Sequence, residues 1–590
     1  MKAMTTAYIV KCPHIPMTGL KPEMHNPTLP LSMIDILDSP GVCGGDEKGP
    51  AITIALLYDA VCRVHGNSVM KLYQDTGRSP PSIPVFEKLP PHKTEFWQLG
   101  AIFEDEGTIS GTYGVHNAIF LKQFGLKAPE TPLGQEKDDF RDRLWIVHGD
   151  QLTAHHVRAV KSAQFRAARP YDRRDWMLCV PSWFHMQMAL QNTVVRTHFS
   201  ADTGSNGTRH CITADATTWG RTIGDRASPK YHILDPLLAQ GFTARILAMF
   251  YDILERRGFL DLATDIDGKD KEAGSFEKPE HFDRAIQLLE PNDFEEVLEE
   301  IRQTAFTLEA WDGEGHADTE FKTMCRMLQE VELFLTVRHA VKHADIGLLR
   351  RLVDPMIMVF LGASQWNYAY EMMWYRWNLS PVNTPELQRA ILASGIVNWQ
   401  GRLNTNKPID LGLEHLNGNV KNEMKCYKNS THDEEIIFGR VCLTNTIVRT
   451  LRSKFERVFG EDMTEKHSTA SALQDMFSLA RIIFTGGLAS PRRGLALNGQ
   501  RGVFESEDIF KLGAELLAEK VEYFNRTYTR QSALREGLYS EGVADTGEVD
   551  VTASQIEAYT TYADERTDIN EDPTVDIGPN LGDVQVPGAD

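Results

Sequence analysis

The stretch that decides the expected fold is Leu144-Trp-Ile-Val-His-Gly-Asp-Gln-Leu-Thr153. It is an apolar, β-prone run that stops abruptly at Gly149-Asp150, which predicts a buried strand with a carboxylate at its end. Acids in the loops at strand ends are frequent catalytic and metal-binding groups. Asp150 or Thr153 is also suited to cap a helix starting near Ala154, since Asp and Thr are preferred N-cap residues. One strand-to-helix turn allows both roles, and the sequence leaves the two equal.

Two further strand-like runs between residues 94 and 190 also end in ionisable side chains. Phe96–Phe103 runs into Glu104-Asp-Glu-Gly-Thr108, where Asp105 lies among three adjacent acids that repel one another unless a cation or basic group offsets them. A Glu-Gly turn is the structural alternative there. Trp176–His185 ends in a histidine beside aromatic residues, where a satisfied core histidine competes with a functional one. The alternation of strand-like and helix-like patterns predicts an α/β layer.

A third acid is expected from the second half of the chain. The aromatic and methionine positions 366, 370, 373, 374 and 377 form a helical stripe, and Glu371 lies at its edge, which predicts partial burial. A buried carboxylate requires a metal, an arginine or a raised pKa. A salt bridge to Arg376 or another basic neighbour is the structural alternative. Glu414, beside His415, is the rival third acid on another amphipathic helix.

Asp105, Asp150 and one of the two glutamates together predict a site for Mg²⁺ or Mn²⁺. Two such ions, about 4 Å apart, need several carboxylate oxygens and act on phosphate groups. Hard oxygen ligands suit Mg²⁺ better than zinc. A zinc alternative rests on four histidines, of which the adjacent His155 and His156 cannot share one helix face: His148, His155, His156 and His185.

The chain divides by composition into six segments. They are an irregular and helical region that packs on the core (1–93), the first half of an α/β core (94–190), a helical insertion (191–360), the second half of the core with the last acid (361–460), C-terminal helices (461–545) and an acidic tail expected to be disordered (546–590). Helices are predicted at Pro236–Arg257, His281–Glu300 and Thr319–His343 from apolar residues at three- and four-residue spacing.

Net charge bears on the expected partner. The chain carries −20 overall, but fourteen acidic residues and one basic residue lie between Glu536 and Asp590, so the remainder is only weakly acidic. A basic cluster follows Asp150, as a solvated helix face or as a surface that contacts phosphate: Arg158, Lys161, Arg166, Arg169, Arg173 and Arg174.

The remaining composition predicts an intracellular, nuclear protein. No apolar run approaches the roughly 18 residues that span a bilayer, so no membrane partner is expected. The eight cysteines are scattered without a CxxC pair, as in an intracellular protein with reduced thiols. A homo-oligomer remains an open alternative.

Five motifs in order carry a resemblance to a known family: Glu-Gly-Thr-Ile-Ser-Gly (106–111), His-Gly-Asp-Gln-Leu-Thr (148–153), Trp-Phe-His-Met-Gln-Met (183–188), Asn-Tyr-Ala-Tyr-Glu (367–371) and Leu-Glu-His-Leu-Asn (413–417). The series resembles the fungal domain-of-unknown-function family DUF6589 over most of residues 90–460. That family's name supplies no activity.

A looser similarity links the same motifs to Mutator-like and hAT-like transposases. It implies an RNase-H-like mixed sheet interrupted by a helical insertion, and an Asp/Asp/Glu metal triad. Carried over by motif, the triad is Asp105, Asp150 and Glu371, and His185 is the histidine after the second acid. The Cys-x-x-His spacing of the Mutator-like pattern is absent, because Cys179 lies six residues before His185.

The implied function is a transposon-derived two-metal DNA nuclease or strand transferase. One alternative is a catalytically inactive, domesticated remnant that acts as a DNA- or protein-binding scaffold. Another is a metallophosphoesterase that uses Asp150 with His148, His155 and His185.

Overall fold

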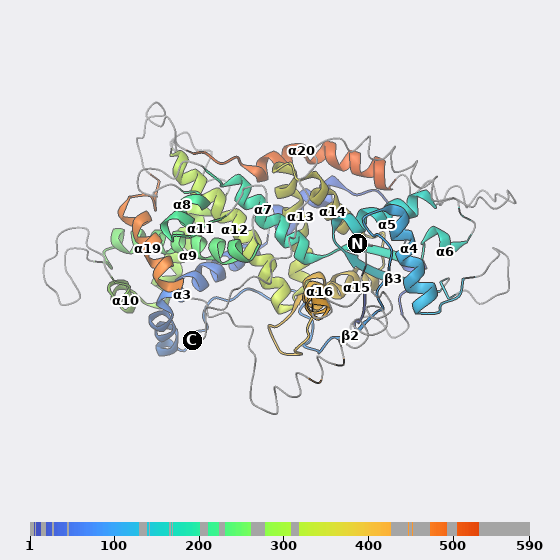
Figure 1. The fold of residues 1–590 in the computed structure, drawn as a ribbon. Helices are drawn as coiled ribbons and strands as arrows, with labels where there is room; N and C mark the ends of the chain where they lie inside the picture. The colour runs from blue at the N-terminus through green and yellow to red at the C-terminus, as the bar shows by residue number, and fades with distance from the viewer. Residues whose placement is uncertain are drawn as a thin grey trace.

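A computed structural model gives a mostly helical protein, in which helices account for 65% of the described residues (Figure 1). The structure describes residues 5, 7–12, 19–25, 29–43, 46–128, 139–140, 142–164, 167, 169–200, 210–223, 231–260, 278–307, 318–425, 447, 451, 472–491 and 504–529. The acidic tail expected at 546–590 lies outside them.

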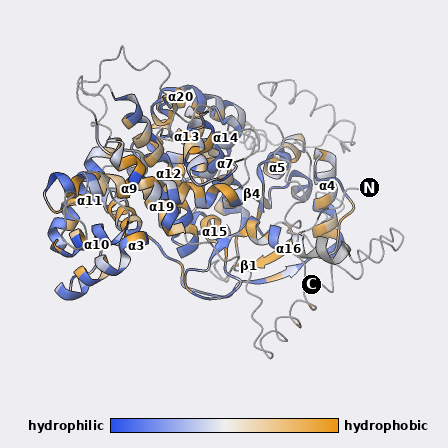
Figure 2. Cartoon of the chain, turned by 60° about the vertical axis from the view of Figure 1, so that its left-hand side comes forward, coloured by the Kyte–Doolittle hydropathy of each residue, from blue (hydrophilic) through white to orange (hydrophobic). Residues whose placement is uncertain are grey.

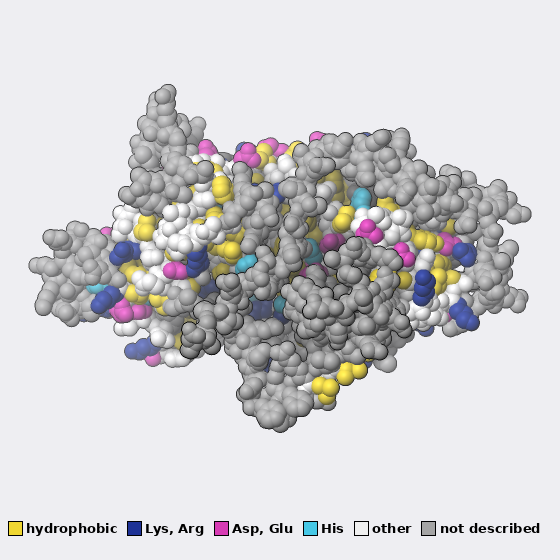
Figure 3. All heavy atoms as spheres, in the orientation of Figure 1, with side chains coloured by type: hydrophobic (Ala, Val, Ile, Leu, Met, Phe, Trp, Pro, Cys, Tyr) yellow, Lys and Arg dark blue, Asp and Glu magenta, His cyan; other side chains and the backbone are white. Residues whose placement is uncertain are grey.

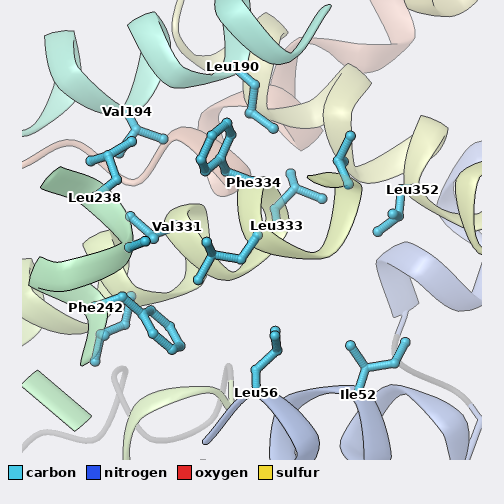
Figure 4. Close-up of a cluster of buried hydrophobic side chains, with 14 of the residues drawn as sticks. Ile52, Leu56, Leu190, Val194, Leu238, Phe242, Val331, Leu333, Phe334 and Leu352 are labelled. Carbon is cyan, nitrogen blue, oxygen red and sulfur yellow. The ribbon is translucent and has the colours of Figure 1, made fainter. Parts of the chain in front are cut away.

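The main body consists of long helices that bury a common core. Its principal members are α3 (Lys48–Thr76), α7 (Trp183–Thr197), α9 (Tyr231–Arg256), α11 (Pro291–Ala305), α12 (Thr319–His343) and α13 (Ile346–Gly362). Figure 4 shows Leu56 of α3, Leu190 of α7, Phe242 of α9, Phe334 of α12 and Leu352 of α13 meeting in this core. Figure 2 shows hydrophobic residues concentrated where α9 and α12 pack together, and hydrophilic ones along α10 and α11. Helix α11 buries one apolar stripe at three- and four-residue spacing, whereas α9 is buried at every residue from Leu237 to Tyr251.

Shorter helices complete the body and the layer beside it. They are α1 (Met33–Leu37), α2 (Pro40–Cys43), α4 (Ile109–Asn117), the π-helix η2 (Ala118–Gln123), α5 (Gln151–Ala163), α6 (Pro170–Arg173), α8 (Ile212–Thr218), α10 (Glu280–Gln287), α14 (Trp366–Asn378), α15 (Pro385–Ser394), α16 (Ile409–Lys425), α19 (Ala472–Thr485) and α20 (Ile509–Phe524). Of all the described helices, α9 alone has the length and hydropathy to cross a membrane, and 94% of its apolar window is buried within the protein.

A two-stranded parallel sheet separates two cores. Strand β3 (Trp145–Gly149) pairs with β4 (Met177–Pro181), with Trp145 opposite Met177 and Gly149 opposite Pro181, and α5 forms the crossover. Every residue of β4 is buried. Because side chains alternate along a strand, Leu178 and Val180 join the large helical core, whereas Met177 and Cys179 join a smaller aromatic cluster around Trp176.

The expectation of an RNase-H-like mixed sheet is wrong for the described residues. Strand β2 (Glu95–Gln98) pairs antiparallel with β1 (Tyr8–Lys11), not with β3, so the strand-like runs of residues 94–190 do not form one sheet. In the segment 361–460, the described strands are only the two-residue β5 (Ile396–Val397) and β6 (Lys407–Pro408). Apolar runs show strand propensity, but pairing depends on distant partners that the runs do not encode. In place of the expected α/β core, the described residues are mostly helical, with three two-stranded sheets.

Candidate acidic site

Asp150 lies at the carboxyl end of β3 and begins α5. Its Oδ1 accepts a hydrogen bond of 2.7 Å from the backbone N–H of Thr153, so Asp150 is the N-cap of α5. A Cβ at Gly149 would lie 2.6 Å from Thr153 Cγ2, which explains the glycine before the cap. The capping role is thereby confirmed, and the role of Asp150 as a metal ligand stays a prediction.

The turn that carries the three adjacent acids is fastened to the same helix. The Glu106 carbonyl accepts a 2.9 Å hydrogen bond from Nδ1 of His156, which lies in α5 six residues after Asp150. Thr108 caps α4 by accepting from Gly111 N–H at 3.0 Å. Asp105 is exposed, and its Oδ1 accepts from Gly107 N–H at 3.0 Å, so its carboxylate shapes the turn.

Glu106 is the acid of this turn whose ionisation depends most visibly on its neighbours. Burial of the carboxyl raises its pKa, and the charges of Asp150, Asp105 and Glu414 raise it further. Four acids from three separate parts of the chain therefore lie within electrostatic reach of one another. No sequence motif identified Glu106 as a site residue; only its position next to Asp105 pointed to it.

His185 and Asp410 form a hydrogen-bonded pair next to these acids. Asp410, in the first turn of α16, accepts from the backbone N–H groups of Phe184 (3.1 Å) and His185 (3.0 Å) at the start of α7. Its Oδ2 also lies 2.8 Å from His185 Nδ1. Burial disfavours protonation of His185, but the hydrogen bond and charge of Asp410, with Asp150 and Glu414, outweigh it and raise the pKa. Asp410, which no sequence pattern identified, thus positions His185, and Glu414 lies one turn further along α16.

Glu371 is engaged by an arginine. Its Oε2 accepts a 2.9 Å hydrogen bond from Arg158 Nη1, and its Oε1 accepts from Arg158 Nη2. The Arg158 guanidinium also lies 5.3 Å from the centre of the Trp374 ring. Burial raises the pKa of Glu371, Arg158 opposes the rise, and Asp150 adds to it. The structural alternative of a salt bridge to a basic neighbour is therefore confirmed, with Arg158 in place of Arg376.

The basic cluster turns inward rather than toward solvent. Lys161 Nζ donates to the Met177 carbonyl at 2.7 Å, and Arg174 is fully buried, donating to the Tyr171 carbonyl at 2.6 Å. Arg169 pairs with Asp172 at 2.5 Å and Arg173 with Asp175 at 2.8 Å.

Arg166 lies outside the described residues. On the face shown in Figure 3, the Lys and Arg side chains of the described residues occur singly or in small groups near acidic ones. The described members of the basic cluster therefore give the DNA-contact prediction no support, and it stays a prediction.

The described residues form no preformed metal site for either the Mg²⁺ or Mn²⁺ prediction or the zinc alternative. Within the described ranges, no group of three or more His, Cys, Asp or Glu side chains is arranged to hold a metal. Burial lowers the pKa of His148 and of His155 to about 4, and His148 Nε2 lies 2.9 Å from Ser394 Oγ. The expectation of Mg²⁺ or Mn²⁺ stays a prediction; Mg²⁺ keeps several waters and needs only one or two carboxylates.

The fold and site define a class: a mostly helical protein with clustered acids at the carboxyl end of a two-stranded parallel sheet. The chain belongs to the family described as "Family of unknown function (DUF6589)", whose model matches residues 55–467. No curated protein and no solved structure matches the chain. The family resemblance is confirmed, and nothing in these comparisons supports the link to transposases.

Proposed function

We propose that this protein is a Mg²⁺- or Mn²⁺-dependent phosphodiesterase that acts on DNA, as a nuclease or strand transferase. Asp150, Glu106 and Glu414 are the acids assigned to the metal, with Asp105 at the rim. The supporting observations are that Asp150 ends β3, that the Glu106 carbonyl accepts a hydrogen bond from His156 of the helix that Asp150 caps, and that the charges of Asp150, Asp105 and Glu414 act on the Glu106 carboxyl. Glu371, the third acid expected from the transposase similarity, is the weaker candidate because Arg158 neutralises it.

Each side chain has a distinct part in this proposal. Divalent ions held by the carboxylates would supply activation of water or of a 3′-hydroxyl and stabilisation of the leaving oxygen. A divalent cation would offset the negative charge of these acids, which favours metal uptake by the site. His185, oriented by Asp410 and with its pKa raised, carries a proton more readily than an ordinary histidine and is suited to donate it to the substrate.

The test is nicking of supercoiled plasmid by the full chain with Mg²⁺ or Mn²⁺. Asp150→Asn removes the charge but keeps the cap, because Asn caps helices as well as Asp. We expect it, and Glu414→Gln, to lower the rate about a hundredfold, equivalent to about 2.7 kcal/mol. Comparing Glu106→Gln with its exposed neighbour Asp105→Asn tells which acid of the turn acts. Equal nicking by wild type and Asp150→Asn, or no metal-dependent nicking at all, would overturn the proposal.

An inactive DNA-binding scaffold is the second candidate, favoured by the neutralised Glu371. It predicts salt-sensitive DNA binding without cleavage. Asp150→Asn would then bind DNA as tightly as wild type or more tightly, because it removes negative charge near phosphate. Fluorescence anisotropy with a labelled duplex, at two salt concentrations, separates this outcome from catalysis.

A further inference from the structure

The last turns of α12 carry two histidines on one face, away from the acidic site. His339 and His343 are four residues apart, the spacing at which helical side chains are neighbours. Their rings stack with centroids 3.8 Å apart and planes inclined by 21°. Both side chains are partly exposed. Two histidines at this spacing on a helix are the pair that zinc-binding helices use.

The protonation of the pair favours a metal ligand. Nδ1 of His343 lies 2.9 Å from the His339 carbonyl, which only accepts, so Nδ1 carries the proton and Nε2 of the neutral ring has a lone pair. Burial and the neighbouring His343 lower the pKa of His339 to about 4. Burial also lowers the pKa of His343, against the opposing effect of its hydrogen bond to the His339 carbonyl. Both rings are therefore neutral near pH 7, the form that binds metals.

The charged groups around the pair balance one another. Asp59 of α3 acts on His339, while Lys342 acts on both histidines and Lys88 on His343. Asp345 is occupied as the cap of α13, and it also accepts from Phe86 and Glu87 N–H, each at 2.9 Å. The carboxyl end of α12 adds a negative partial charge that favours a cation.

We propose that His339 and His343 bind a divalent transition metal of borderline softness, with Zn²⁺ as the ion to test and Ni²⁺ or Cu²⁺ as competitors. Imidazole nitrogen is a preferred ligand of these ions, whereas Mg²⁺ prefers oxygen. To bind one ion, the two rings would leave the stack so that both Nε2 atoms face it, as histidines four residues apart on a helix do in zinc sites. Two protein ligands leave the remaining positions to water, so the site is open to an incoming ligand.

The experiment measures Zn²⁺ affinity of the untagged full chain at pH 7.5, by competition with a chromophoric chelator in excess Mg²⁺. His339→Ala and His343→Ala should each weaken binding by at least about tenfold, since even outer-shell partners of a metal are worth about 10- to 100-fold in affinity. His92→Ala, at a partly exposed histidine outside α12, should bind as wild type does. Asp150→Asn should also bind normally, which separates this site from the acidic one.

The pH profile provides a second measurement that does not depend on the variants' folding. Zn²⁺ affinity of wild type should fall as the pH is lowered, because imidazole binds a metal only in its neutral form. A stacked pair that serves only to pack the end of α12 would leave Zn²⁺ affinity the same in wild type and both variants. That result would overturn the proposal. So would a loss of binding in His92→Ala or Asp150→Asn while His339→Ala and His343→Ala bind normally.

Discussion

At the scale of single residues, the Arg158–Glu371 pair shows how the helical body constrains the acidic site. The Arg158 side chain is 12% exposed and that of Glu371 2% exposed, so water contributes little to the solvation of either charge. Removing one partner from such a pair leaves an uncompensated charge, which costs about 3–5 kcal/mol, whereas replacing both is often neutral. The pair is therefore a structural constraint between α5 and α14.

We predict that Arg158→Met lowers the free energy of unfolding by about 3–5 kcal/mol, because it leaves the Glu371 carboxylate buried and unpaired. The double variant Arg158→Met with Glu371→Met should recover most of the loss. Chemical denaturation followed by circular dichroism measures both variants. A single variant as stable as wild type would show that the pair contributes nothing to folding.

For these residues, local sequence patterns predict burial and helix capping but not the partners that are distant in the chain. Burial of Glu371 and capping by Asp150 follow from local patterns, and both are confirmed. The partner of Glu371 lies 213 residues away in the chain, and no local pattern identifies it. Asp105 and Glu106 are adjacent in a turn, where no strand or helix period tells which side chain faces Asp150.

At the scale of elements, α20 packs on α13 through two glycines. A Cβ at Gly513 of α20 would lie 2.0 Å from the Met358 carbonyl oxygen, and a Cβ at Gly362 of α13 would lie 1.8 Å from that of Ile509. The two helices therefore meet backbone to backbone, as Figure 1 shows for α20 lying along α13. Helix α20 follows the part of the chain that the family model matches.

Gly513→Ala should lower the thermal midpoint, because the added methyl group forces α20 away from α13 at a cost of about 1–3 kcal/mol. Gly66→Ala in α3 is the matched control, since nothing lies within 4 Å of its Cβ position. That control should be neutral or stabilising by about 0.5–1 kcal/mol, the gain of Ala over Gly in a helix. Equal loss in both variants would contradict the close helix contact.

Among the elements, helices are far more predictable from this sequence than sheets. The range expected for Thr319–His343 coincides with α12, and the range expected from Pro236 corresponds to α9. Helix periodicity is local and is repeated over several turns, so packing rarely overrides it. Of the strand-like run at residues 96–103, only residues 96–98 lie in a strand, β2, and its partner is β1, near the N-terminus. A sheet depends on such long-range pairings. The apolar runs do not encode their partners, so they do not determine which strands form one sheet.

In the molecule as a whole, the β3–β4 sheet separates two hydrophobic cores. The large core joins helices from α3 to α20, and the smaller one gathers Trp176, Phe120 and Phe140 on the opposite side. Regions with separate cores can open separately, because local stability follows local burial. The acidic site lies at the end of this sheet, where α5 packs on β3 and β4 and α16 packs on β3 and α7.

Two adjacent residues of β4 allow this division to be tested. Met177 is buried in the small core and Leu178 in the large one, and truncating either to alanine should cost about 2–5 kcal/mol. We predict that Met177→Ala accelerates hydrogen exchange in α5 and η2, while α9 and α12 stay protected. Leu178→Ala should instead accelerate exchange in the helices of the large core. Peptide-resolved hydrogen exchange measures both, and identical exchange patterns in the two variants would show that the molecule has one cooperative core rather than two.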